Sequence, residues 1–163
     1  MKYLKFIFYF IPLLLVLAAC NQEDDICTEG GTPRMKVKYK KDGKLFKVDT
    51  LMIKILSGKD TLTVTRATQD QLGIDSTYIP LKVNGDGYTD ILIRQVRKND
   101  KTGYSVIRMK YNETSEYVSP GCGIRKLYDN VSAEVTQPNQ VKSVELNTNQ
   151  IHNESQTVLY FNF

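Results

Sequence analysis

Hydrophobic and polar residues alternate along most of the chain beyond residue 33. In residues 34–41, RMKVKYKK, the apolar Met35, Val37 and Tyr39 alternate with basic residues, which is typical of a strand with one buried face. Further strand-length segments, with turn residues between them, lie at 45–56, 61–65, 76–83, 88–97, 104–112, 115–123, 124–135, 143–151 and 157–163. No amphipathic helix of ordinary length is predicted. We therefore expect an all-β domain built as an antiparallel β-sandwich, immunoglobulin-like or similar, with a small barrel as the alternative.

Asp42 and Gly43 are expected to form a hairpin turn between the first two of these segments, because both residue types tolerate the positive φ of such a turn. The expected core consists of apolar residues on one face of each strand. These are Val37, Tyr39, Leu51, Ile53, Ile55, Leu62, Val64, Ile79, Leu81, Ile91, Ile93, Val106, Leu159 and Phe161.

The first residues of the chain have the pattern of a secretory signal peptide. Lys2 and Lys5 precede the apolar run 6–19, FIFYFIPLLLVLAA. At ~1.5 Å per residue this run spans roughly 21 Å, which is short of the ~30 Å hydrocarbon core of a bilayer. Its end, LAAC at 17–20, resembles the lipobox of bacterial lipoproteins. The resemblance implies cleavage after residue 19 and acylation of Cys20; the alternative is an ordinary signal peptide followed by an unrelated cysteine.

Three segments follow from this interpretation: a lipoprotein signal peptide at 1–19, a lipid-anchored acidic tether at 20–33 and one β-sandwich domain at 34–163. Asn21 stands where an aspartate typically retains lipoproteins in the inner membrane, so we expect the outer membrane of a Gram-negative bacterium. Glu23, Asp24 and Asp25 are similar to an acidic signal for surface export. A solvated acidic tether explains these residues as well, so the sequence does not decide whether the protein faces the periplasm or the cell surface.

The charge of the chain argues against a nucleic-acid partner. The formal net charge of +4 would fall by two when Lys2 and Lys5 leave with the signal peptide, and no concentrated basic stripe remains. Lys36, Lys38 and Lys40 share one face of a predicted strand, where lysines commonly block edge-to-edge pairing. Contact with anionic glycans or lipid headgroups is the alternative.

Two further cysteines, Cys27 and Cys122, would lie in an oxidising compartment, where they have one way to pair with each other. A bridge between them would close a loop of ~95 residues, and the chain-entropy relation gives about 4.6 kcal/mol for that length. The alternative is two thiols that never meet.

Residues 82–90, KVNGDGYTD, resemble a calcium loop. Asn84, Asp86 and Asp90 occupy its third, fifth and ninth positions, but Lys82 replaces the first aspartate. Because calcium is bound largely by carboxylate and carbonyl oxygens, the lysine removes a ligand and adds a repelling charge. A hairpin turn built on Asn-Gly and Asp-Gly explains the same residues. We favour the turn, keep the three residues as weak calcium candidates, and expect no other metal and no cofactor.

Residues for catalysis are scarce. The single histidine, His152, lies in a polar segment, the glutamates are scattered, and no serine lies in a G-x-S-x-G elbow. We therefore expect a protein that is not an enzyme. Tyrosines with one solvated face provide a candidate patch for a glycan or a protein, although rings buried at the rim of the sheet are the simpler explanation. They are Tyr104, Tyr111, Tyr117, Tyr128 and Tyr160.

The segments EDDIC, TPRMKVKY, DSTYIPL, EYVSPGCG followed by KLYDNV, and IHNES followed by VLYF are similar to a family of small Gram-negative outer-membrane lipoproteins of unknown function. The resemblance spans residues 20–163 and includes Cys27 and the pair Cys122–Gly123, which supports the bridge. It implies a location and a fold class but no catalytic residue. We expect a non-enzymatic envelope protein held to the membrane by lipid and acting through protein contacts; the alternative is a surface module that binds a glycan or, weakly, calcium.

Overall fold

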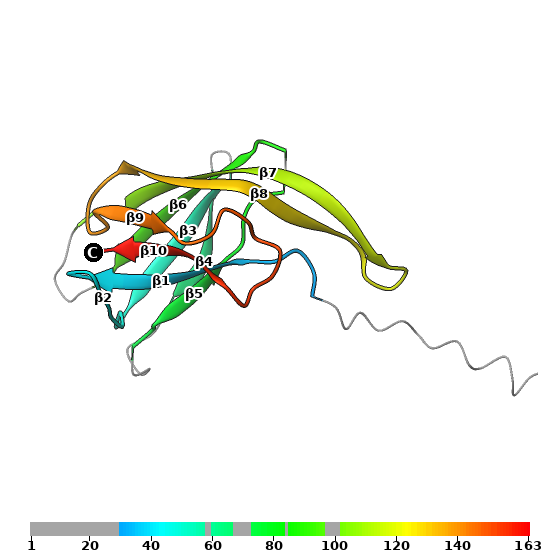
Figure 1. Cartoon of the computed structure of the whole chain (residues 1–163). Helices are drawn as coiled ribbons and strands as arrows, with labels where there is room; N and C mark the ends of the chain where they lie inside the picture. Colours follow the sequence, from blue (N-terminus) through cyan, green and yellow to red (C-terminus); the bar gives the residue numbers. More distant parts are fainter. Residues whose placement is uncertain (1–29, 58–59, 67–72, 84, 97–101) are drawn as a thin grey trace, which may run out of the picture.

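The computed structural model describes residues 30–57, 60–66, 73–83, 85–96 and 102–163, which form two β-sheets packed face to face (Figure 1). None of these residues lies in a helix, so none belongs to a helix long and apolar enough to cross a bilayer. The predicted all-β sandwich is confirmed, and the small barrel is not formed because the two sheets stay separate.

The first sheet has five strands. β1 lies between β10 on one side and both β2 and β5 on the other, and β9 pairs with the far side of β10. Their bounds are β1 (Met35–Lys41), β2 (Lys44–Leu45), β5 (Ser76–Ile79), β9 (Ser143–Leu146) and β10 (Thr157–Asn162). β1 and β10 run parallel, which brings the two ends of the domain together in the middle of this sheet.

The second sheet also has five strands, in the order β4-β3-β6-β7-β8, and all of its pairs are antiparallel. Their bounds are β3 (Leu51–Ser57), β4 (Asp60–Arg66), β6 (Tyr88–Gln95), β7 (Ser105–Ser119) and β8 (Gly123–Gln137). β7 and β8 are the longest strands described, with 15 residues each.

The core lies between the sheets, where every second residue of the inner strands is buried. Burial alternates along β1, so that Met35, Val37 and Tyr39 face the core while the lysines between them lie outside. Fully burying a side chain of this size contributes about 1.5–3 kcal/mol before chain entropy is subtracted. The same period-two pattern was the basis of the sequence prediction, and most residues expected in the core are buried.

Two expected core positions were wrong. Leu62 is 61% exposed and lies on β4, the edge strand of its sheet, which has a neighbour on one side only. Val106 is half-buried on the outer face, and its neighbour Ile107 points inward instead. Both residues are apolar, so the sequence does not fix the register, and a shift of one residue exchanges the two faces.

The Asp42–Gly43 turn is confirmed, but the strand after it is shorter than predicted. Asp42 and Gly43 have φ of 51° and 75°, and the turn joins β1 to β2. β2 ends at Leu45, and the chain then crosses to the second sheet, where β3 begins at Leu51. Val48 is fixed at the crossing by two backbone hydrogen bonds of 2.9 Å with Ile74. The predicted strand 45–56 is therefore two strands in different sheets.

Candidate functional site

The feature that most distinguishes the molecule is the hairpin formed by β7 and β8, which extends beyond the sandwich (Figure 1). On β7 the alternation of buried residues ends at Tyr111, and on β8 burial begins at Tyr128. Residues 112–127 therefore project beyond the core, and we call them the arm. The turn at its end consists of Pro120, Gly121 and Cys122.

The base of the arm is fixed by two buried tyrosines. The rings of Tyr111 and Tyr128 meet edge to face, with centroids 4.9 Å apart. The Tyr111 hydroxyl donates to the carbonyl oxygen of Lys82 at 2.7 Å and lies 2.7 Å from Thr89 Oγ1. Burial raises the pKa of both phenols above the ordinary value, so both stay protonated over the physiological range. The arm thus starts from a packed and hydrogen-bonded base.

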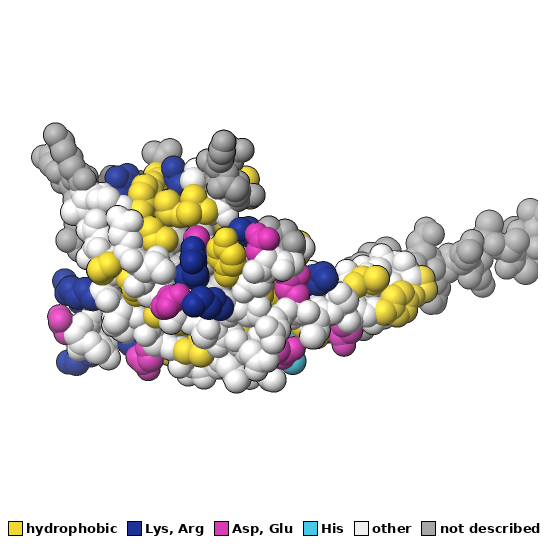
Figure 2. Space-filling model, turned by 90° about the horizontal axis from the view of Figure 1, so that it is seen from above, with side chains coloured by type: hydrophobic (Ala, Val, Ile, Leu, Met, Phe, Trp, Pro, Cys, Tyr) yellow, Lys and Arg dark blue, Asp and Glu magenta, His cyan; other side chains and the backbone are white. Residues whose placement is uncertain are grey.

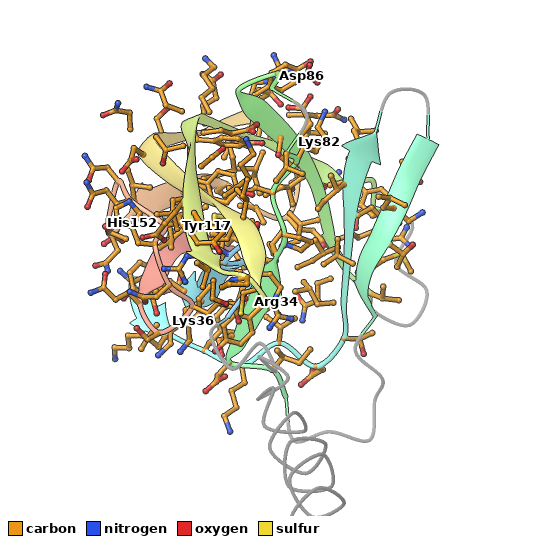
Figure 3. The ribbon with its side chains drawn as sticks, turned by 90° about the vertical axis from the view of Figure 1, so that its right-hand side faces the viewer. Arg34, Lys36, Lys82, Asp86, Tyr117 and His152 are labelled. Atoms are coloured by element: carbon orange, nitrogen blue, oxygen red, sulfur yellow. The ribbon has the colours of Figure 1, made fainter. Side chains whose placement is uncertain are left out.

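The far end of the arm exposes apolar side chains. Tyr117 and Ile124 stand directly opposite each other in the hairpin register, and they are 65% and 69% exposed. Figure 2 shows hydrophobic side chains at this end of the molecule, and Figure 3 labels Tyr117 on the arm. Glu116 and Arg125, the next pair along the hairpin, form an ion pair at 2.6 Å. The exposed apolar side chains of the arm therefore lie near its tip.

The chain enters the domain beside the arm. The Lys126 backbone N–H donates to Thr32 Oγ1 at 3.0 Å, and Arg125 Nη1 donates to the carbonyl oxygen of Gly30 at 3.4 Å. Thr32 contacts residue 126 and Gly30 contacts residue 125. The earlier residue of the chain, Gly30, therefore contacts the position on β8 that is nearer to the tip. The last residues of the predicted tether 20–33 thus already contact β8.

Several predicted site residues lie outside the described residues. They are the signal peptide 1–19, the predicted lipid-anchor residue Cys20, the acidic residues Glu23, Asp24 and Asp25, and Cys27. The acylation, the export signal and the disulfide stay predictions. Cys122 itself lies half-buried in the turn of the arm, where its backbone N–H donates to Ser119 Oγ at 3.1 Å.

The 82–90 loop connects two sheets and is not a hairpin turn, because β5 belongs to the first sheet and β6 to the second. Asn84 lies outside the described residues. Asp86 lies 3.5 Å from Lys82 Nζ (Figure 3). Both carboxylate oxygens of Asp90 accept hydrogen bonds from Arg108, each at 2.7 Å. Among the described residues no cluster of three or more acidic, histidine or cysteine side chains could hold a metal ion.

Arg108 interacts with two residues of this loop. Its hydrogen bonds with Asp90, and then the negative charge of that carboxylate, raise its pKa above the ordinary value. Its guanidinium also lies 4.7 Å from the centroid of the Tyr88 ring, and Lys82 Nζ lies 5.1 Å from the same centroid. A shallow hollow of about 360 Å³ is lined in part by Tyr88, Arg108 and Lys110. The two basic side chains, Arg108 and Lys110, already form ion pairs within the protein.

Carboxylates that a hydrolase could use are also engaged in ion pairs. Each glutamate in the described part of the chain has a basic partner within 4 Å, as the pairs Arg34–Glu154, Lys40–Glu145, Lys110–Glu134, Arg125–Glu116 and Lys126–Glu113 demonstrate. His152 Nε2 lies 2.9 Å from Asp129 Oδ1, on the surface. These contacts connect neighbouring strands and loops, and they do not converge on one point.

The five candidate tyrosines do not form one exposed patch. Tyr111 and Tyr128 are buried at the base of the arm. Tyr104 donates to Met52 Sδ at 2.8 Å, and Lys40 Nζ lies 4.1 Å from the centroid of the Tyr160 ring. Tyr117 alone among the five is a largely exposed ring. A flat patch of stacked tyrosines is therefore not formed.

A second apolar surface, which the sequence did not reveal, lies on the outer face of the second sheet. Leu92 and Val106 pair across β6 and β7, and Met52 lies on the same face of β3; we call these three residues the outer patch. All three are half-buried, with Lys54 and Arg94 beside them on this face. The signal that could have found the patch is the run of apolar residues on both faces of β6.

The fold and these surfaces define an all-β sandwich with one protruding hairpin and no metal-binding cluster among its described residues. The chain belongs to a family of unknown function, DUF6452, which matches residues 35–163. The match includes the whole arm and Cys122 and begins after Cys27. Neither the curated proteins nor the solved structures contain a match.

Proposed function

We propose that the chain is a lipid-anchored, non-enzymatic protein of the outer membrane of a Gram-negative bacterium, and that it acts through contacts with an envelope protein partner. The lipobox-like LAAC at 17–20 supports the anchor, with Cys20 as the acylated residue. Acylation with two or more chains, palmitate among them, gives stable attachment, whereas one chain alone binds only marginally.

The observation that carries the proposal is the place where the chain enters the domain. Gly30 and Thr32 lie along β8 within the arm, so the chain that follows the proposed anchor joins the domain at the end that bears the arm. The opposite parts of the sandwich, including the outer patch, are then left free for a partner.

A disulfide between Cys27 and Cys122 is part of the proposal. Cys27 lies three residues before Gly30, and Cys122 lies three residues before Arg125, the residue that contacts Gly30. Three residues reach about 10 Å at most. Because Gly30 itself contacts Arg125, a bridge between the two cysteines needs no more than this reach on each side of the contact.

The anchor is tested by mass spectrometry of the protein from native membranes. The expected material begins at Cys20 and carries acyl chains, and Cys20→Ala leaves the protein unacylated and unable to float with membranes. Native protein that retains its first 19 residues, or that lacks any acyl chain, would overturn the proposal. Fractionation of inner and outer membranes tests the location.

The partner is tested by a photo-crosslinking amino acid placed at Leu92 in the outer patch. We expect a discrete crosslinked product on intact cells. The matched control carries the same amino acid at Gln150, which is exposed in the loop between β9 and β10 and is not part of the outer patch. Equal products from both positions, or none from Leu92, would count against a partner at the outer patch. Turnover of a peptide or glycan by the purified protein would refute the non-enzymatic role.

A further inference from the structure

We propose that the tip of the arm lies in the headgroup region of the membrane that holds the lipid anchor, so that the arm acts as a second membrane contact and a spacer. This inference rests on the proposed function, because it needs the anchor at Cys20. It assigns to the arm a ligand of stated chemistry, which is the polar–apolar interface of a phospholipid bilayer.

The side chains at the tip suit that interface. Tyr117 and Ile124 are 65% and 69% exposed and lie on the same face of the hairpin, and Pro120 is exposed in the turn. Tyrosine combines an apolar ring with a polar hydroxyl, and it is enriched where a bilayer meets water. Burying an exposed isoleucine side chain against acyl chains is favourable by up to about 3 kcal/mol.

The charges of the arm do not oppose such a contact. Residues 112–127 contain two acidic and two basic side chains, Glu113, Glu116, Arg125 and Lys126, and so have no net charge. Glu116 and Arg125 are paired at 2.6 Å, and Glu113 and Lys126 lie 3.9 Å apart. These pairs lie on the base side of Tyr117 and Ile124, which leaves the final turn uncharged.

The backbone limits the depth of the contact. Within the hairpin the backbone groups of the two strands form hydrogen bonds with each other. In the turn, the Cys122 backbone N–H donates to Ser119 Oγ. The outer edges of a two-stranded hairpin keep unpaired backbone groups, which are costly in hydrocarbon. The tip therefore stops at the boundary between the headgroups and the acyl chains and does not span the bilayer.

The length of chain before the domain fits this position. Gly30 follows Cys20 by ten positions, and a chain of that length reaches ~35 Å at most. From Asn112 to Ser119 the β7 side of the arm has eight residues, which is ~26 Å at the rise of a β-strand. Because Gly30 lies beside Arg125 on the arm, the tip is within the reach of the anchor. The arm then holds the sandwich, and the outer patch with it, clear of the membrane.

A protein partner is a poorer occupant for the tip. A stable protein interface buries ~800 Å² on each partner. The tip offers two largely exposed hydrophobic side chains and a short turn, which is far less surface. A bilayer has no such requirement, because the anchor already holds the protein beside it.

The test uses the absence of tryptophan from the chain. Tyr117→Trp introduces a single fluorescent reporter at the tip, and the full acylated protein is reconstituted into vesicles of phosphatidylethanolamine and phosphatidylglycerol. Vesicles with brominated acyl chains quench indoles that lie in the membrane. Tyr160→Trp is the matched control, because Tyr160 lies on β10 in the body of the sandwich.

We expect Tyr117→Trp to emit at a shorter wavelength on vesicles and to lose most of its emission on brominated vesicles, whereas Tyr160→Trp changes little. Ile124→Trp is a second reporter on the same face and should behave like Tyr117→Trp. Protein that floats with the vesicles while neither tip reporter is quenched overturns the inference and leaves the anchor intact. A short-wavelength emission without quenching also overturns it, since the tip is then covered by protein. Failure to float refutes the proposed function itself.

Discussion

The rings of Tyr111 and Tyr128 meet with their planes at 76° at the place where the arm leaves the sandwich. Each comes from one strand of the hairpin, and each is buried against residues of the 81–89 region. The packing of this pair therefore fixes the direction in which the arm leaves the core. Any function that depends on where the tip lies depends on this contact.

The hydroxyl groups of Tyr111 and Tyr128 should contribute differently to the free energy of unfolding. Tyr111 donates to the Lys82 carbonyl at 2.7 Å, whereas the Tyr128 hydroxyl lies 3.5 Å from the Leu81 carbonyl. Tyr111→Phe should therefore lower the free energy of unfolding by about 1–3 kcal/mol, because the buried carbonyl of Lys82 loses its partner. Tyr128→Phe should cost less. Urea unfolding followed by circular dichroism measures both, and equal losses would contradict the assignment.

The ion pair between Arg34 and Glu154 should make stability depend on pH in the acid range. Hydrogen bonds from Arg34 lower the pKa of Glu154 from 4.5 to about 2. A carboxylate with a depressed folded-state pKa stabilises the fold above its unfolded pKa, and this contribution is lost as pH falls from 4.5 toward 2. Both side chains are exposed, so we expect no more than about 1 kcal/mol.

Glu154→Gln measures this contribution. The difference in unfolding free energy between the wild type and Glu154→Gln should be largest near neutral pH and should shrink below pH 4.5. Added salt should reduce the difference at neutral pH, because exposed charges are screened. A difference that stays constant from pH 7 to pH 2.5 would show that the pair contributes nothing through its charge.

The bidentate contact between Asp90 and Arg108 predicts how the 82–90 loop responds to calcium. Both oxygens of Asp90 already accept hydrogen bonds, so millimolar calcium should leave the unfolding temperature of the protein unchanged. Arg108→Gln should lower the unfolding temperature, because the buried carboxylate of Asp90 then loses a charged partner. Thermal unfolding with calcium or with magnesium as control tests both statements. A rise specific to calcium that disappears in Asp86→Ala would restore the calcium interpretation.

The fold class was predictable because most strands carry their apolar residues on one face. In β1 the alternation of Met35, Val37 and Tyr39 with lysines leaves one choice of buried face. The register of β7 was not predictable, since Val106 and Ile107 are adjacent and both apolar. The parallel pairing of β1 with β10 was also beyond reach, because it joins residues about 120 positions apart and no local pattern encodes it.

The arm was missed for a different physical reason. Its residues do not pack on a core, so the segment NETSEYVS has no regular apolar period to detect. The predicted segments 104–112, 115–123 and 124–135 are in fact two strands of 15 residues, and Pro120 begins the turn between them. The exposed pair of Tyr117 and Ile124 becomes recognisable only when the register places the two residues opposite each other.

The proposed disulfide gives the largest effect on stability and has a thermodynamic signature of its own. A bridge closing a loop of ~95 residues restricts the unfolded chain, and its loss should cost about 4–5 kcal/mol in the chain-entropy model. Cys27→Ser and Cys122→Ser should each produce this loss, and the double variant should be no less stable than either, because all three lack the same bond. Urea unfolding of the four proteins measures the cycle, and peptide mapping without reductant identifies the bridge. Losses that add in the double variant would mean that the two cysteines act separately, and the segment before Gly30 would then have no covalent tie to the tip of the arm.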